Sequence, residues 1–94
     1  MPEQTSVEKI TAVYKSMNEV SIEKNRRYGD SALNGAKIFS KLDSTSSICI
    51  RLDDKLARVK NSNELRKNDI SDIIGYLVLL SVSEGWLDFS DQID

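Results

Sequence analysis

In the first third of the chain, the side chains that would form one face are spaced as in a helix and not as in an extended strand. From residue 7 to residue 28, seven side chains recur at steps of three and four: Val7, Ile10, Tyr14, Met17, Ser21, Lys24 and Tyr28. A helix with 3.6 residues per turn brings such positions to one face. Thr5 and Glu8 form a T-x-x-E capping box, a typical start of a helix. We therefore predict one long amphipathic helix over residues 5–27.

This helical face changes in character along its length. It begins apolar and ends polar, so that Lys24 is directed along the core-facing side near the predicted end of the helix. Such a lysine either extends its ammonium group to solvent and interacts with the helix dipole, or binds an anionic ligand. Both explanations stay open from the sequence.

Two further helices are predicted from apolar periodicity. A Ser- and Thr-rich cluster after Asp43 precedes the first, at residues 46–61, and Asn63 or Asn68 is expected to cap the second, at residues 64–84, which Gly85 ends. The core face of the 46–61 helix is predicted to consist of Cys49, Leu52, Leu56 and Val59.

The remaining segments connect or follow these helices. Residues 28–45 are predicted to form a loop with a short helical turn near residues 36–42, and residues 85–94 an acidic tail. The fold class is thus all-α: a single domain over residues 1–94, built as a compact bundle of three long helices plus the short turn. A chain of 94 residues buries only about 60 to 65% of its unfolded surface, so a homo-oligomer is also expected.

The composition excludes several kinds of chemistry. The chain has one cysteine and no histidine, which excludes an internal disulfide, a thiolate-rich zinc site and a histidine base. Any metal would have oxygen ligands, which favours magnesium or manganese. No apolar run approaches the roughly 20 residues of a membrane span, and no signal peptide is recognisable. We expect a cytoplasmic protein, in a bacterium or in the host of a phage, without membrane partners.

The small net charge of −2 conceals a segregation along the chain. Residues 24–67 contain eleven basic and five acidic side chains, whereas residues 68–94 contain six acidic side chains and no basic one. The basic block attracts phosphate groups, while the acidic end argues against general binding to nucleic acid. The alternative is that the two blocks attract each other within the fold.

Charged side chains close to apolar faces mark the candidate site. Asp69 and Asp72 lie one turn apart above Tyr76 on the third predicted helix, and Asp54 lies on the second. Two structural explanations without a ligand are also open. Asp54 could form a row of surface ion pairs with its basic neighbours, and Asp69 and Asp72 could serve as acids near the start of a helix, where they interact favourably with its dipole. Arg27, Tyr28 and Ser31 belong to a glycine-bounded loop whose composition suits a phosphate or a stacked base.

The chain resembles a family of small phage and bacterial helical proteins, the nucleotide-modification-associated family, which is related to the all-α MazG-like pyrophosphatases. The resemblance spans about residues 23–82. It rests on four stretches: Tyr28-Gly29-Asp30-Ser31-Ala32-Leu33-Asn34, Ile38-Phe39-Ser40, Arg51-Leu52-Asp53-Asp54-Lys55-Leu56-Ala57-Arg58 and Asp69-x-x-Asp72-x-Ile74-Gly75-Tyr76-Leu77.

The resemblance implies nucleotide chemistry. MazG-like enzymes hydrolyse nucleoside triphosphates with magnesium held by an E-x-x-E pair and an E-x-x-D pair on successive helices. Asp69 and Asp72 resemble the second pair. The first pair is represented only by adjacent Asp53 and Asp54, whose side chains point about 100° apart on a helix. The resemblance therefore implies nucleotide binding more strongly than hydrolysis.

These observations lead to three hypotheses. The first is a magnesium-dependent nucleotide pyrophosphohydrolase, the second a phage-type protein that sequesters a nucleotide-derived immune signal without chemistry, and the third a helical adaptor whose charges serve only the fold. The catalytic residue of the first is unknown. The predicted metal ligands are Asp54, Asp69 and Asp72, the phosphate-binding residues are Lys24, Arg27, Arg51, Lys55 and Arg58, and the nucleotide-binding residues are Tyr28, Ser31 and Tyr76.

Overall fold

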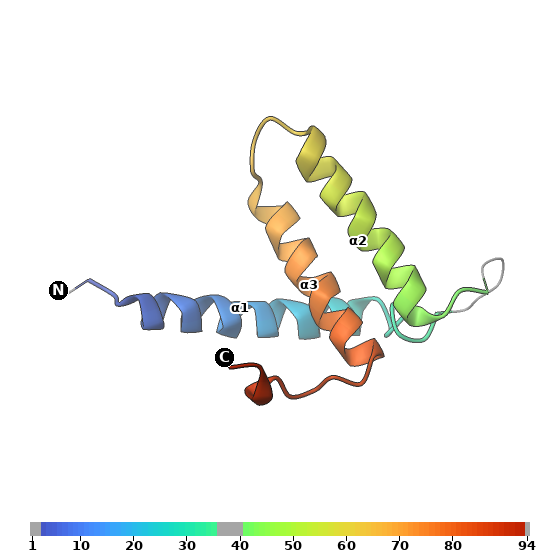
Figure 1. Ribbon diagram of the computed structural model, residues 1–94, viewed down its shortest axis with the longest axis horizontal. Coiled ribbons are helices and arrows are strands. Elements are labelled where there is room, and N and C mark those ends of the chain that lie inside the picture. Colours follow the sequence, from blue (N-terminus) through green and yellow to red (C-terminus); the bar gives the residue numbers. More distant parts are fainter. Residues whose placement is uncertain (1–2, 36–40, 94) are drawn as a thin grey trace.

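Three α-helices dominate the structure, a computed structural model that describes residues 3–35 and 41–93 (Figure 1). They are α1 (Ser6–Arg27), α2 (Ser44–Asn61) and α3 (Lys67–Ser83), and a 3₁₀ turn, η1 (Ser90–Gln92), follows in the C-terminal segment. The described residues contain no strand, so the predicted all-α class is confirmed. None of the described helices is both long and apolar enough to cross a bilayer.

The capping box fixes the start of α1 close to the predicted position. The Glu8 amide donates to Thr5 Oγ1 at 3.1 Å, and the Thr5 amide donates to Glu8 Oε1 at 3.4 Å. The last turn contains Lys24, Arg26 and Arg27, whose charges oppose the partial negative charge of the helix end.

Helix α2 begins two residues before its predicted start. Asp43 is its N-cap, and the Asp43 carboxylate accepts a hydrogen bond of 2.7 Å from the Ser46 amide. A negatively charged carboxylate next to the exposed amides of a first turn stabilises that turn.

The predicted start of α3 at residue 64, with Asn63 or Asn68 as its cap, is wrong. The helix begins at Lys67, and its N-cap Arg66 makes no side-chain capping bond. The Ser62 hydroxyl instead bonds both backbone groups of Glu64 and holds a turn there. At the other end Gly85, with φ of 78°, ends α3 in a Schellman arrangement, in which the Trp86 amide donates to the Ser81 carbonyl at 2.9 Å.

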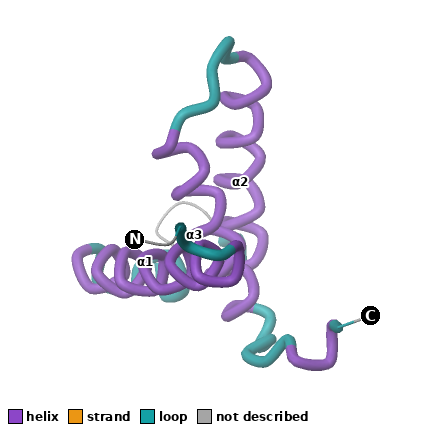
Figure 2. Tube along the Cα trace, turned by 90° about the vertical axis from the view of Figure 1, so that its left-hand side faces the viewer, coloured by secondary structure: helices purple, strands orange, loops and turns teal. Residues whose placement is uncertain are grey.

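Helices α2 and α3 lie side by side and antiparallel, and α1 crosses α3 near its C-terminal half (Figures 1 and 2). Ile48, in the first turns of α2, is 1% exposed. The predicted core face of α2 is partly wrong: Leu56 is 49% exposed, whereas Ile48 and Lys55 face inward. The contact with α3 turns α2 so that residues 48, 52, 55 and 59 face the partner helix.

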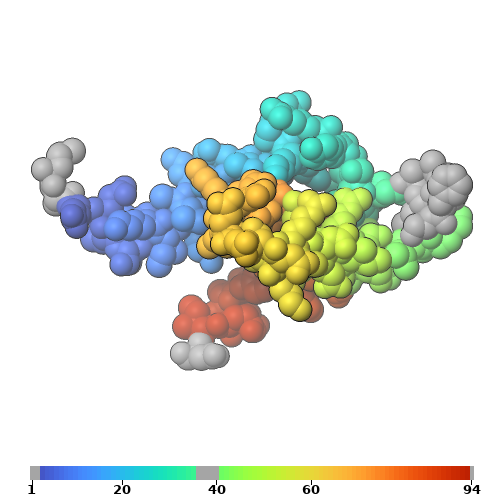
Figure 3. All heavy atoms as spheres, turned by 90° about the horizontal axis from the view of Figure 1, so that it is seen from above, coloured from blue at the N-terminus to red at the C-terminus, as the bar shows by residue number. Residues whose placement is uncertain are grey.

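The N-terminal half of α1 projects beyond the α2–α3 pair (Figure 3). Every residue from Ser6 to Ser16 is exposed, and burial on α1 begins at Met17. The predicted short helical turn, with Ile38 and Phe39, falls mainly on residues 36–40, which lie outside the described residues.

Candidate functional site

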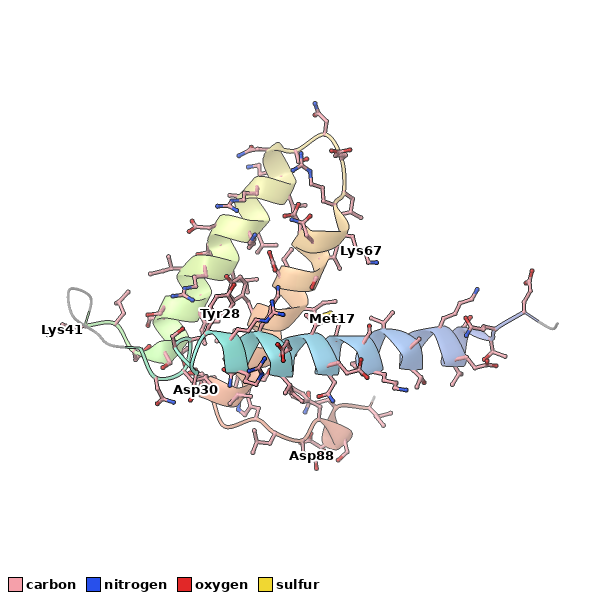
Figure 4. All side chains as sticks on the ribbon, turned by 180° about the vertical axis from the view of Figure 1, so that it is seen from behind. Met17, Tyr28, Asp30, Lys41, Lys67 and Asp88 are labelled. Carbon is pink, nitrogen blue, oxygen red and sulfur yellow. The ribbon has the colours of Figure 1, made fainter. Side chains whose placement is uncertain are left out.

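A pocket of about 500 Å³ lies between the second half of α1 and one face each of α2 and α3. Tyr28 and Met17, labelled in Figure 4, mark the stretch of α1 that borders it. The pocket lining includes seven predicted site residues: Lys24, Tyr28, Ser31, Arg51, Lys55, Asp72 and Tyr76.

Helical spacing explains why these side chains meet. Arg51 and Lys55 are four residues apart on α2, as are Asp72 and Tyr76 on α3, so each pair lies on one helix face. Lys24 continues the inward stripe of α1 from Met17 and Ser21. The pocket therefore receives one face from each of the three helices.

The centre of the pocket is an aspartate held by two lysines. Lys55 Nζ lies 2.7 Å from Asp72 Oδ2, and Lys24 Nζ lies 3.0 Å from Asp72 Oδ1. The side chains of Asp72 and Lys55 are only 23% and 16% exposed, whereas that of Lys24 is 51% exposed. The hydrogen bond from Lys55 lowers the pKa of Asp72 below its ordinary value, with a further contribution from Lys24, while partial burial acts in the opposite direction.

The charges on the pocket wall do not cancel. Lys24, Lys55 and Arg51 contribute three positive charges against one negative charge from Asp72. Arg51 makes no ion pair with any residue that the structure describes. An ammonium group has three donor hydrogens, so each lysine retains donors beyond its bond to Asp72. The pocket thus has spare positive charge and spare donors for an anion.

Tyrosines and a glycine shape the rest of the wall. Tyr28 is 69% exposed at the rim, and Tyr76 lies on α3, one turn beyond Asp72. A Cβ atom placed on Gly75 would have nothing within 4 Å, so no close helix crossing explains this glycine. Open space beside a helical glycine that lines a pocket is instead compatible with a ligand that approaches the backbone.

The turn after α1 positions Tyr28 and Ser31. Gly29 and Asp30 both adopt positive φ, at 59° and 63°, and the Asp30 amide donates to the Asn25 carbonyl at 3.1 Å. Asp30 tolerates this conformation better than most residues, and its carboxylate also accepts a hydrogen bond from the Asn34 side chain. The local backbone therefore turns sharply and returns Ser31 to the pocket.

Four predicted site residues lie outside the pocket lining: Arg27, Asp54, Arg58 and Asp69. Arg27 pairs with Glu23 on its own helix, with 3.0 Å between Arg27 Nε and Glu23 Oε1. Arg58 and Asp54 are exposed on α2. The ion-pair row considered around Asp54 does not form among the described residues, because Lys55 pairs with Asp72 on α3 instead.

The aspartates as arranged do not fit a magnesium site. Within residues 3–35 and 41–93, no three acidic or cysteine side chains lie close enough to hold a metal ion. Both carboxylate oxygens of Asp72 contact lysine ammonium groups. These positive groups occupy the oxygens that would otherwise bind a magnesium ion. Magnesium binding stays a prediction from the sequence.

The pocket also contains polar residues that sequence reasoning missed, including Asn25, Ser71 and Ser21. Ser21 Oγ is buried and has no hydrogen-bond partner among the described residues. The sequence did contain a signal for Ser21, because a serine between Met17 and Lys24 interrupts the apolar face of α1.

Comparison of the chain with protein-family models, curated proteins and solved structures gives no match.

Proposed function

We propose that the protein binds a nucleotide or a nucleotide-derived small molecule in this pocket, through its phosphate groups. The observation that carries the proposal is the excess of positive charge at Lys24, Arg51 and Lys55 around a pocket bordered by two tyrosines. A volume of about 500 Å³ lies within the usual range for small-molecule sites.

The phosphate groups are proposed to contact the three cations. Arg51 has no ion pair within the described residues, and its guanidinium has a fork of donors that matches two phosphate oxygens. Lys24 is the more exposed of the two lysines, so its ammonium group is free to turn from Asp72 toward a ligand. Lys55 is more buried and remains the fixed positive charge beneath the ligand.

The base is proposed to lie against the tyrosines. A nucleobase has an apolar face that stacks on an aromatic ring, a contact worth about 1 to 3 kcal/mol. Tyr28 at the rim has the exposed ring that such stacking needs, and Tyr76 borders the same pocket beside Gly75. Phosphate recognition and base stacking together select nucleotides over inorganic phosphate.

Binding without chemistry is favoured over hydrolysis. The Asp72 carboxylate is neutralised by two lysines, and Asp54 and Asp69 do not line the pocket. A protein with this site would retain an intact ligand, as expected for the sequestration of a nucleotide-derived immune signal in the cytoplasm of a phage-infected bacterium.

Hydrolysis is the second candidate, because of one observation on α3. Asp69 is only 7% exposed and makes no hydrogen bond or ion pair with the described residues, one turn from Asp72. A cation close to a poorly exposed carboxylate offsets the cost of its partial burial. Incubation with nucleotides and magnesium tests this candidate: turnover that an Asp69→Ala/Asp72→Ala variant loses supports it, and turnover equal to that variant's removes it.

Calorimetry with a matched pair of variants tests the proposed binding. Linear and cyclic nucleotides are titrated into the wild type, into Arg51→Ala and into Arg58→Ala. Both arginines are exposed on α2, but only Arg51 lines the pocket. We expect at least about 10-fold weaker binding for Arg51→Ala, no change for Arg58→Ala, and recovery of the intact ligand. Absence of binding to every nucleotide, or equal losses in the two variants, contradicts the proposal.

A further inference from the structure

The N-terminal half of α1 has an apolar face that no part of the described chain covers. Val7, Ile10, Val13 and Tyr14 are 72%, 57%, 53% and 76% exposed. Among the described elements α1 packs only on α3 (Figure 1), and burial along α1 begins only at Met17. The C-terminal segment does not cover this face either: it runs beneath α1 in Figure 1 but lies apart from it in Figure 2.

A half-helix of this length needs support from outside. An isolated helix shorter than about 12 to 15 residues is marginal in water, and its stability normally comes from packing of its apolar face. The exposed part of α1, Ser6 to Ser16, receives no such packing from the described residues. A second packing partner would supply the missing burial.

The spacing on this face is that of a helix pair. Val7, Ile10, Tyr14 and Met17 follow alternating steps of three and four, which is the 3.5-residue repeat of two helices packed along a common seam. The positions that flank such a seam are Thr11 and Asn18 on one side and Val13 and Val20 on the other.

The charge pattern allows that partner to be the same helix. Every flanking position is uncharged, and the charged side chains of this stretch, Glu8, Lys9, Lys15 and Glu19, point away from the seam. Two identical helices can therefore meet along this seam without placing like charges against each other. In pairs of two different helices, the positions that flank the seam commonly carry charges that select the partner. The flanking positions of this seam carry none.

The exposed area of the chain is larger than that of a compact monomer of the same mass. Its accessible surface is 7972 Å², whereas a compact monomer of 10.6 kDa exposes about 5,500 Å². The radius of gyration is 15.6 Å, against about 12 Å for a compact chain of this length. The excess of roughly 2,500 Å² per chain is enough for an obligate interface between subunits.

We propose that the seam Val7, Ile10, Tyr14 and Met17 of α1 is a self-association surface, on which the same seam of a second copy packs. The inference concerns a surface outside the proposed phosphate-binding residues and does not depend on any ligand. Of the four seam residues only Met17, at the end of the seam, also lines the pocket, so Val7, Ile10 and Tyr14 lie outside it.

Two isoleucines on α1 form a matched test. Ile10 lies on the seam and is 57% exposed, whereas Ile22 lies off the seam and is 62% exposed. Sedimentation velocity of the full chain is expected to give a wild-type mass of at least twice 10.6 kDa. Ile10→Asp should weaken association by about 100-fold or more, because a charge would be desolvated in the seam, while Ile22→Asp should leave the mass unchanged. A wild type that sediments as a monomer, or equal effects of both variants, overturns the proposal.

A second measurement covers the case in which Ile10→Asp does not fold. The thermal midpoint of the wild type is measured by circular dichroism over an about 100-fold range of protein concentration. Unfolding coupled to dissociation makes the midpoint rise with concentration, and this is the result we expect. A midpoint independent of concentration means that the folded chain needs no second copy, and it overturns the proposal whatever the variant does.

Discussion

A helix of a water-soluble protein usually turns its apolar side chains inward and its polar side chains to solvent. The two halves of α1 both depart from this rule. The half that packs against α3 presents polar side chains inward, namely Ser21, Lys24 and Asn25, whereas the half that projects from the bundle presents Val7, Ile10 and Tyr14 to solvent. Buried polar groups need partners, and exposed apolar stripes need cover. Helix α1 thus has a polar surface suited to a ligand in one half and an uncovered apolar surface in the other.

The difference separates two roles along a single element. Polar groups around a pocket are suited to a small anion, because they supply charge and hydrogen bonds over a few ångströms. An apolar stripe at helical spacing is suited to another helix, because it supplies a long dry contact. Substitutions in one half should therefore affect ligand binding, and substitutions in the other half should affect assembly.

The largest effect within the pocket half is expected from Lys55→Met. This change leaves the poorly exposed Asp72 carboxylate with Lys24 alone, and it should lower the free energy of unfolding by about 2 kcal/mol. It should also weaken nucleotide binding by about 10-fold or more, since one of three cations is lost. Urea unfolding and calorimetry measure both. Lys60→Met, an exposed lysine on the same helix outside the pocket lining, is the control and should change neither quantity.

A smaller effect is expected from acid. The pKa of Asp72 is lower in the folded chain than in the unfolded one, so its ion pairs stabilise the fold fully above the unfolded pKa of about 4 and are lost as the pH falls through the folded pKa. About 1 kcal/mol of stability should disappear below pH 4 on this account. The difference in unfolding free energy between the wild type and Asp72→Asn isolates the contribution. A difference that stays constant from pH 7 to pH 3 would contradict it.

The apolar half can be weakened without touching its seam. Thr5→Ala removes the capping bond to the Glu8 amide and should destabilise the first turn of α1 by about 1 kcal/mol. Because that turn presents Val7, self-association should weaken about 5-fold while nucleotide affinity stays unchanged. Thr5→Ser retains a capping hydroxyl and should restore association in sedimentation experiments. Equal weakening of nucleotide binding would show that the two halves are not separable.

The smallest effect is expected from Arg27→Gln. Arg27 pairs with Glu23 on an exposed side of α1 and does not line the pocket, although the sequence placed it among the phosphate-binding residues. Calorimetry should show the same nucleotide affinity for the variant and the wild type. A loss comparable to that of Arg51→Ala would extend the site around the end of α1.

Local signals predicted the helices better than their boundaries and faces. The start of α1 was readable because Thr5 and Glu8 bond each other, but the start of α3 was not, since Arg66 makes no side-chain capping bond. On α2, stripes through Ile48 and through Cys49 both satisfy helical spacing, and only packing against α3 selects the one with Ile48.

The sequence predicted which charged residues belong to the site better than it predicted which of them pair with each other. Spacing along α2 places Lys55 next to Asp54, while in the structure it pairs with Asp72, seventeen positions away on another helix. Pairing over such a separation depends on how α2 and α3 cross, which no local pattern contains. For the same reason the sequence grouped Asp54 and Asp69 with Asp72, although neither of them lines the pocket.

Native mass spectrometry of the full chain tests the two surfaces together. The protein is mixed with a pool of linear and cyclic nucleotides, separated from the unbound excess and measured intact. The account predicts assemblies whose masses are multiples of 10.6 kDa and which retain an unmodified nucleotide that Arg51→Ala fails to retain. A 10.6 kDa monomer without a bound nucleotide would contradict both the phosphate-binding pocket and the self-association seam.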